Sequence, residues 1–357
     1  MTVSQEQSGC FPAGCASISV QAAFPIEIGQ TGMLTVYVHD KGRLMPSDWK
    51  GGVTLPAETV WIDLLRPTSN EEGTIEAALR IDIPVREKLA EIEASSRLYT
   101  QGDAIFMTAT IISRADGDKP EIDAITFIVK GQILVTVRYC EPRSFDIFVA
   151  RSQRPEGCPP TGDGVFVSLL EAIVDRAADH LERVGTIAAA TSKEVFQTAD
   201  GKSRNFTSLL RRIGEEGDFT SDVRESLVSL SRLAAFYSAV LDVDRKSEGR
   251  KVQRSHLKTL QRDLSSLTDH ASFLSDKISF ILDATLGMIT IEQNAIIKIF
   301  SVAAVVFLPP TLIASIYGMN FKVIPEFEWV LGYPFALSLM VASVLATFIY
   351  FRRKGWL

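Results

Sequence analysis

Two long runs without a charged side chain close the sequence, and they limit the possible folds more than any other feature. They occupy residues 299–321 and 330–351. Each is as long as the roughly 20 helical residues that cross the hydrocarbon core of a bilayer, and a soluble core rarely contains two such runs joined by a short loop. The sequence therefore predicts membrane-spanning helices at 295–317 and 330–351, with a connecting loop at 318–329.

The charges beside these runs predict their orientation. Arg352, Arg353 and Lys354 follow the second run in a basic tail at 352–357, whereas the connecting loop has one lysine against two glutamates. Basic residues favour the cytoplasmic side of a membrane. Because two spans place both chain ends on one side, we expect a multi-pass protein of the cell's inner (plasma) membrane with cytoplasmic N- and C-termini.

The region before the runs has a mixed pattern. Residues 1–30 are predicted to be a loose tail, and residues 31–158 a cytosolic α/β domain in which strands alternate with helices near 71–79 and 85–94. A hairpin turn is expected at Lys-Gly-Gln, between the last two strands. The predicted strands are LTVYV, TVWIDL, AIFMTATII, AITFIV and ILVTV.

Composition excludes several classes of function. A net charge of −6 gives no electrostatic reason to expect a nucleic acid partner. The sequence has no GxxxxGK[ST] or GxGxxG pattern, so no nucleotide cofactor is predicted. The four cysteines and four histidines are scattered, which fits neither a disulfide framework nor a zinc site. No catalytic set is apparent, and the chain is not expected to be an enzyme.

Residues 159–294 are predicted to form a helical stalk, with helices near 165–193 and 206–240 and a longer helix that begins near residue 249 and continues into the first span. On this longer helix, apolar residues recur at alternating spacings of three and four. Such a seam packs against other helices in coiled-coil-like bundles. The seam contains Leu257, Leu260, Leu264, Leu267, Ala271, Leu274, Ile278, Ile281, Thr285 and Met288.

An acidic stripe lies on the face of this helix away from the seam. Asp269, Asp276 and Asp283 are spaced by seven residues, and the stripe continues into the first span. Charge repeats of this kind are common on the solvated face of a stalk helix. If several copies meet at one axis, however, the same residues become rings of carboxylates, which concentrate cations.

The sequence Tyr-Gly-Met-Asn, at residues 317–320, follows the first span directly. It resembles the signature that the CorA family of Mg²⁺ channels has at the outer end of its first membrane helix. The resemblance covers residues 294–357 and includes Pro309, Pro325, the sequence Gly-Tyr-Pro at 332–334, and the final Trp-Leu. In the region before the spans, only the order of the domains is similar.

The resemblance implies an α+β membrane protein that assembles into a funnel-shaped homopentamer. The first span would line a pore for Mg²⁺ and the second would face the lipid bilayer. Mg²⁺ would be both the transported ion and a regulatory ion, and Co²⁺ or Ni²⁺ could also pass.

By the same resemblance, Gly318, Met319 and Asn320 would form the selectivity filter. Mg²⁺ releases its water reluctantly, so a ring of Asn320 amides can bind the hydrated ion through its waters without gripping the metal. Gly318 is expected to let the backbone turn out of the helix. The alternative for Asn320 is an asparagine that simply ends a helix.

One face of the first span is expected to line the pore. Among its members, Asn294 and Thr311 would form polar rings, whereas Ile297, Phe300 and Leu308 would form a hydrophobic gate that closes by dewetting. The alternative for the three gate residues is packing against lipid or another helix. The predicted pore-lining residues are Asn294, Ile297, Ser301, Ala304, Leu308, Thr311 and Ser315.

Further acidic residues complete the predicted ion pathway. Glu326 in the outer loop would attract cations to the mouth, although Lys322 opposes it. Asp283, Asp276 and Asp269 are candidates for a regulatory or funnel metal site. The partner carboxylate from the α/β domain stays open between Asp103 and Asp116.

Two other functions remain open at this stage. One is a Zn²⁺ transporter of the same superfamily, although Met319 favours Mg²⁺. The other is a membrane-anchored sensor or scaffold with a coiled-coil stalk and no pore, which would explain the seam and both spans but not a polar face that ends in Gly-Met-Asn.

Overall fold

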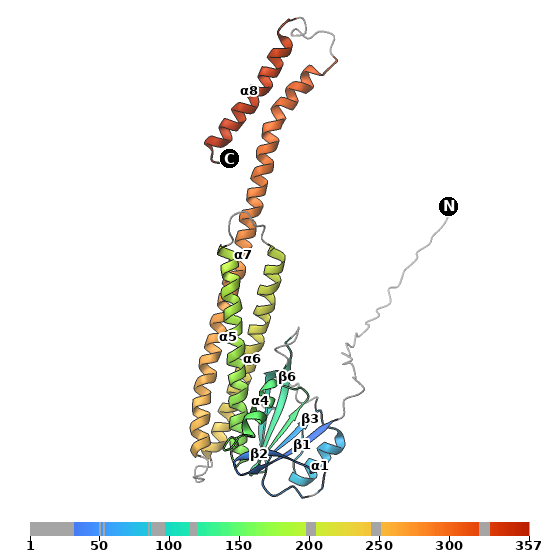
Figure 1. Cartoon of the computed structure of the whole chain (residues 1–357), viewed down its shortest axis with the longest axis vertical. Coiled ribbons are helices and arrows are strands. Elements are labelled where there is room, and N and C mark those ends of the chain that lie inside the picture. Colours follow the sequence, from blue (N-terminus) through green and yellow to red (C-terminus); the bar gives the residue numbers. More distant parts are fainter. Residues whose placement is uncertain are drawn as a thin grey trace, which may run out of the picture.

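The molecule is elongated and has three parts: a sheet domain, a helical stalk and a pair of helices beyond the stalk (Figure 1). A sheet domain lies at one end, beside the lower half of a three-helix stalk. One stalk helix, α7, continues beyond the other two, and the C-terminal helix α8 returns along its upper part. This computed structural model describes residues 32–49, 51–52, 54–84, 86, 97–113, 120–197, 205–243, 251–320 and 329–356.

The sheet has seven strands in the order β2-β1-β3-β7-β6-β5-β4. Only β3 and β7 pair in parallel, and every other neighbouring pair is antiparallel. The described sheet is therefore mixed. The strands are β1 (Met33–Asp40), β2 (Arg43–Ser47), β3 (Thr59–Leu65), β4 (Leu98–Gln101), β5 (Ala104–Ile112), β6 (Ile122–Lys130) and β7 (Ile133–Arg138).

The central strands are buried on both faces, because successive side chains of a strand point to opposite sides. On β3, Trp61 faces the stalk and Ile62 faces helix α1 (Ser69–Leu79), where Ile75 is fully buried. A capping box begins α1: the Thr68 hydroxyl accepts from the backbone N–H of Glu71, and the Glu71 carboxylate accepts from the N–H of Thr68.

All five strands predicted from the sequence are confirmed, and so is the hairpin, in which Gly131 has a positive φ of 59°. Strands β2 and β4 were not predicted from the sequence. Both are short edge strands, and β2 contains Pro46, a residue that argues against a strand in sequence-based prediction. Helix α4 (Arg143–Ser152), which begins directly after Pro142, was not predicted either. The helix predicted at 85–94 and the tail predicted at 1–30 lie outside the described residues.

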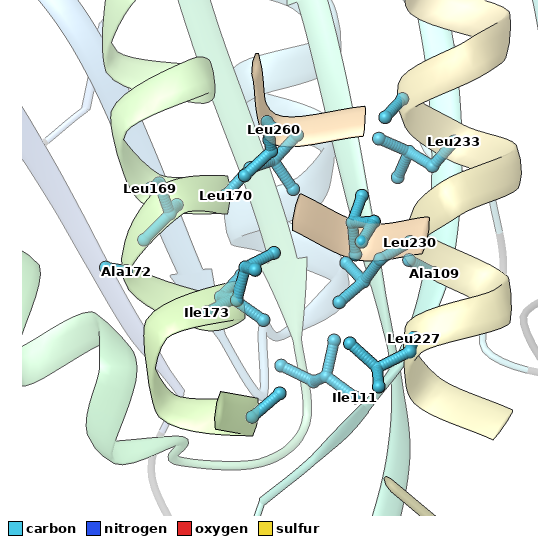
Figure 2. Close-up of a cluster of buried hydrophobic side chains, with 14 of the residues drawn as sticks. Ala109, Ile111, Leu169, Leu170, Ala172, Ile173, Leu227, Leu230, Leu233 and Leu260 are labelled. Atoms are coloured by element: carbon cyan, nitrogen blue, oxygen red, sulfur yellow. The ribbon is translucent and has the colours of Figure 1, made fainter. Parts of the chain in front are cut away.

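Helices α5 (Gly162–Gln197), α6 (Phe206–Val243) and α7 (Lys251–Tyr317) form the stalk. The predicted seam of α7 packs against the other two helices, with Leu267 and Met288 only partly covered. Lower down, the same core reaches the sheet, where Ile111 of β5, Ile173 of α5 and Leu230 of α6 meet (Figure 2). The Thr110 N–H also donates to Ser229 Oγ at 2.9 Å, which ties β5 to α6.

Helix α7 continues for 67 residues, from the foot of the stalk to the end of the first uncharged run. At about 1.5 Å per residue its length is on the order of 100 Å. Pro309 and Pro310 lie inside the helix without ending it. Each removes one backbone donor, and the Thr311 hydroxyl donates to the carbonyl of Phe307 at 2.6 Å. The stalk and the first apolar segment are thus one continuous element.

Candidate functional site

The Gly-Met-Asn sequence lies at the C-terminal end of α7. The N–H of Gly318 donates to the carbonyl of Ala314 at 2.9 Å, and the N–H of Met319 donates to the carbonyl of Ile316 at 3.3 Å. These bonds tighten the last turn, and Asn320 emerges from it exposed. The first span therefore ends in a free amide side chain at the tip of the helix.

Helix α7 ends at Tyr317, so the backbone leaves the helix at Gly318 as expected. The φ of Gly318 is not positive, so the backbone there needs no left-handed conformation. What the glycine provides is space, because a Cβ atom at this position would lie 3.1 Å from the carbonyl oxygen of Ala314. That contact is tighter than most Cβ atoms make, and the helix end would have to shift to accept a side chain.

The upper part of α7 has one covered face. Val302 is buried, and Val306, Pro309, Ile313 and Tyr317 are half-buried. These residues recur every three to four positions, and within the described chain only α8 (Gly332–Arg353) lies beside this part of α7 (Figure 1). The stripe is therefore the one that packs against α8.

The predicted pore-lining residues lie on the opposite side of α7. At about 100° per residue, Thr311 is half a turn from Val302. Within one chain nothing described covers this face, apart from partial burial of Ser301. The exposed members are Asn294, Ile297, Ala304, Leu308, Thr311 and Ser315.

The three predicted gate residues are large, apolar and uncovered. Ile297 is 61% exposed, Phe300 70% and Leu308 64%. Within the described residues most of each side chain is uncovered, so lipid or further copies of the helix could pack against them.

The acidic stripe is exposed as well. Asp269, Asp276 and Asp283 lie on the side of α7 away from the buried seam. Seven residues fall about 20° short of two full turns, so the stripe drifts slowly around the helix. It therefore passes into the face that carries Ile297 and Leu308 in the span above.

The two candidate partner carboxylates have different outcomes. Asp103 lies in the β4–β5 turn and forms an ion pair with Lys130 at 3.0 Å. The hydrogen bond from Lys130 lowers the pKa of Asp103. Asp116 lies outside the described residues, as does Glu326 in the outer loop. Among the described residues, no three His, Cys, Asp or Glu side chains converge closely enough to hold a metal ion.

A cluster that sequence patterns missed lies between α5 and α7. Glu171 and Asp175 of α5 and His256 and Asp263 of α7 line a cavity of ≈ 430 Å³. His256 Nδ1 is 3.4 Å from the Glu171 carboxylate. These residues are far apart in the sequence, and only the register of the two helices brings them together.

The architecture defines the class of protein. A mixed sheet domain and a helical stalk precede two helices that are long and apolar enough to cross a membrane, and the first of these ends in Gly-Met-Asn. This is the arrangement of a membrane protein with its spans at the C-terminal end.

Comparison with known proteins identifies the family. The model of the CorA-like Mg2+ transporter protein family matches residues 56–353. Magnesium transport protein CorA from Pasteurella multocida (strain Pm70) is 32% identical over 325 residues, which cover 91% of this chain and 100% of that protein. The protein of the same name from Haemophilus ducreyi (strain 35000HP / ATCC 700724) is 31% identical over 327 residues, with the same coverage. The chain belongs to the CorA-like Mg²⁺ transporter family, which is a family of transporters rather than enzymes.

The fold agrees with that assignment. The complete structure of the CorA magnesium transporter from Methanocaldococcus jannaschii superposes with a TM-score of 0.71 and covers 92% of this chain and 100% of that one. Sequence identity between the two is only 17%. At this distance the likeness shows that the fold is shared.

Proposed function

We propose that this protein is a Mg²⁺ channel in which five copies of α7 surround a central pore. The observation that carries the proposal is the uncovered face of the first span. It lies opposite the α8 contact, it carries Asn294, Ser301, Thr311 and Ser315, and its helix ends at Asn320. Symmetry would turn each of these positions into a ring.

The amide ring explains how a tightly hydrated ion could pass. Mg²⁺ requires nearly octahedral oxygen ligands and keeps several of its waters. Five Asn320 carbonyl oxygens could accept hydrogen bonds from those waters while the metal stays hydrated. Since conduction requires binding that is weak enough for the ion to leave, a neutral amide suits the outer end better than a carboxylate would. Ions would then move down their electrochemical gradient.

The apolar side chains below would form the gate. Rings of Ile297, Phe300 and Leu308 around a common axis would expel water from a narrow passage. Ions could not cross the dry segment, even though no side chain fills it completely. Small rotations of α7 would widen the passage. Because α7 is unbroken from stalk to span, a movement of the stalk would reach these rings directly.

The acidic stripe gives a physical basis for control by Mg²⁺ in the cytosol. If the stalks meet at the axis, Asp269, Asp276 and Asp283 of neighbouring copies repel one another. Mg²⁺ bound among them would cancel the repulsion and hold the stalks together, whereas loss of Mg²⁺ would let them separate. The partner carboxylate from the sheet domain stays open.

The orientation follows from the charges. The basic residues after α8, Arg352 and Arg353, favour the cytoplasmic side, which would place the sheet domain and stalk in the cytosol and Asn320 at the outer face of the inner membrane. Glu326 would attract cations there and Lys322 would oppose them.

Uptake of Mg²⁺ into proteoliposomes tests the proposal. Asn320→Ala should abolish most of the flux while the protein still elutes as the native oligomer in detergent. Tyr333→Ala is the matched control, because Tyr333 is 77% exposed near the same end of the spans but belongs to α8. Undiminished flux in Asn320→Ala would remove this residue from the pathway.

The same assay separates the alternatives. A Zn²⁺ transporter would carry Zn²⁺ in preference to Mg²⁺, and the two relatives described above are both magnesium transport proteins. Competition by Co²⁺ and Ni²⁺ would measure how far recognition depends on size and charge alone. A scaffold without a pore would show no flux of any of these ions.

A further inference from the structure

A cavity of ≈ 470 Å³ lies where the sheet meets the stalk, away from the proposed pore face. One wall is β4 and β5, the other is α6, and Ser275 of α7 closes one side. Three arginines line it against a single carboxylate, that of Glu225. The remaining polar lining consists of hydroxyl groups, from Thr108, Thr110, Thr220, Ser221, Ser229 and Ser275.

Two of the arginines belong to one face of α6. Arg224 and Arg232 are eight residues apart, which is about two turns and about 12 Å along the helix, and Val228 lies between them on the same face. Within the described part of the chain, neither arginine forms an ion pair or a side-chain hydrogen bond. By contrast, Arg211 at the start of the same helix pairs with Glu215 at 2.7 Å.

The third arginine enters from the sheet side. Arg97 Nη1 donates to the Thr110 hydroxyl at 3.1 Å, and the Thr110 N–H donates to Ser229 Oγ at 2.9 Å. The wall of the cavity is therefore fixed by hydrogen bonds between β5, α6 and Arg97. It presents guanidinium groups from both sides of one space, whereas the hydroxyls of Thr220 and Ser221 on α6 donate to carbonyls of their own helix.

Such a lining suits an oxyanion with several negative charges. Guanidinium groups bind phosphate oxygens through paired hydrogen bonds. The volume falls within the usual range for small-molecule sites, about 300–1,000 Å³, and it exceeds what one phosphate ion needs.

We propose that this cavity binds a polyphosphate anion, and that it prefers the anion without bound Mg²⁺. Mg²⁺ binds to phosphate oxygens and so neutralises part of the charge that the arginines attract. The anion would touch β5, α6 and α7 together, so its binding would tie the sheet to the stalk. Under the proposed function, which this last step requires, the site would report a shortage of Mg²⁺ to the pore helix.

Calorimetric titration of the full-length protein in detergent tests the site without measuring transport. ATP in EDTA is the first probe, ATP in excess Mg²⁺ the second and pyrophosphate the third. We expect ATP to bind in EDTA, at least about tenfold more tightly than in excess Mg²⁺. Pyrophosphate should compete with ATP, because the phosphates are the recognised group. No binding of ATP in EDTA, tighter binding with Mg²⁺, or failure of pyrophosphate to compete would each overturn the proposal.

Substitutions locate the site. Arg224→Gln and Arg232→Gln should each weaken ATP binding at least about tenfold, whereas Arg211→Gln, on the same helix but outside the cavity, should bind like the parent. Arg232→Lys keeps the charge but loses the paired geometry, and it should fall between the parent and Arg232→Gln. Equal weakening by Arg211→Gln would contradict the assignment. Because binding is measured alone, an inactive pore would not affect the result.

Discussion

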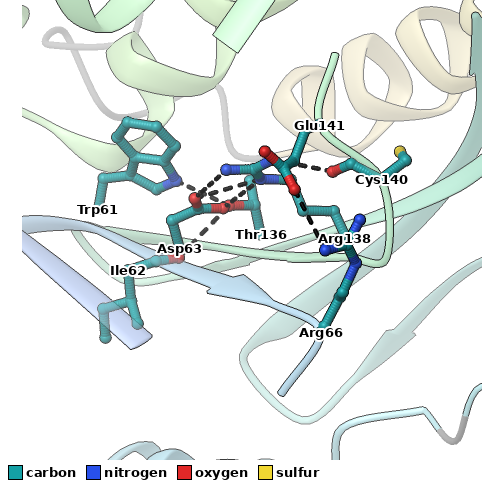
Figure 3. Close-up of polar contacts among 8 residues, drawn as sticks. All are labelled: Trp61, Ile62, Asp63, Arg66, Thr136, Arg138, Cys140 and Glu141. Atoms are coloured by element: carbon teal, nitrogen blue, oxygen red, sulfur yellow. Dashed lines mark hydrogen bonds and ion pairs between the residues drawn. The ribbon is translucent and has the colours of Figure 1, made fainter. Parts of the chain in front are cut away.

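The buried ion pair between Asp63 and Arg138 allows the most quantitative prediction. Asp63 lies within β3 and Arg138 ends the parallel neighbour β7, and their side chains are 3% and 8% exposed. Arg138 Nη2 and Nε donate to the two carboxylate oxygens at 2.7 and 3.0 Å, and Thr136 donates to Asp63 at 2.7 Å (Figure 3). Nη1 of Arg138 donates to the carbonyl of Cys140 at 2.8 Å. The guanidinium of Arg138 thus donates its hydrogen bonds to groups inside the protein, Asp63 and the Cys140 carbonyl.

Removal of the arginine leaves a buried carboxylate with too few donors. Burial alone would lower the pKa of Arg138, but the hydrogen bonds and charge of Asp63 raise it above its ordinary value, so the guanidinium stays charged. Breaking such a pair from one side costs about 3–5 kcal/mol. Arg138→Met should therefore reduce the folding equilibrium constant of this domain by roughly 10²–10⁴-fold.

Trp61 can report this change. Its indole N–H donates to the Thr136 hydroxyl at 2.9 Å, next to the ion pair. Urea unfolding of the full-length protein, followed by fluorescence after the other three tryptophans are replaced by phenylalanine, would measure the loss. The double variant Asp63→Leu/Arg138→Met should recover most of it, because no buried charge is left unpaired. A single variant as stable as the parent, or a double variant no better than the single, would refute this reasoning.

Two further predictions concern the stalk and the thiols. Leu274→Ala on the buried seam, where Leu274 is 1% exposed, should cost about 2–5 kcal/mol in the same unfolding assay; Val252→Ala, at a position 62% exposed on the same helix, is the control and should cost far less. Burial raises the pKa of the Cys158 thiol to about 11 and also raises that of Cys140, so at pH 8 iodoacetamide should modify both only after unfolding. Mass spectrometry would detect the products, and rapid modification of the folded protein would contradict the burial.

Periodicity explains which parts of the fold could be predicted. The uncharged runs, the three-four seam of α7 and the five longer strands each repeat a local pattern, and a local pattern is visible in one dimension. The four-residue strand β4 and the proline-containing strand β2 have no such pattern. They form because β1 and β5 offer backbone hydrogen-bonding groups with which β2 and β4 pair.

Contacts between distant residues explain what could not be predicted. Asp63 and Arg138 are 75 positions apart, and they meet because β3 and β7 pair in parallel. The arginine-lined cavity likewise depends on how α6 lies against β5. The motif that contains Gly318 is visible in the sequence. The contact that a side chain at this position would make with the carbonyl of Ala314 becomes visible only in the folded helix end.

The most direct test of the account asks whether the uncovered face of α7 faces the ion path. In a chain with its native cysteines replaced, Ser315→Cys places a thiol on that face, and Val330→Cys places one just before α8, at a position 94% exposed. After treatment with a positively charged thiol reagent from the outer side, Mg²⁺ uptake should fall in Ser315→Cys and persist in Val330→Cys. Unchanged uptake in fully labelled Ser315→Cys would contradict the placement of this face at the pore.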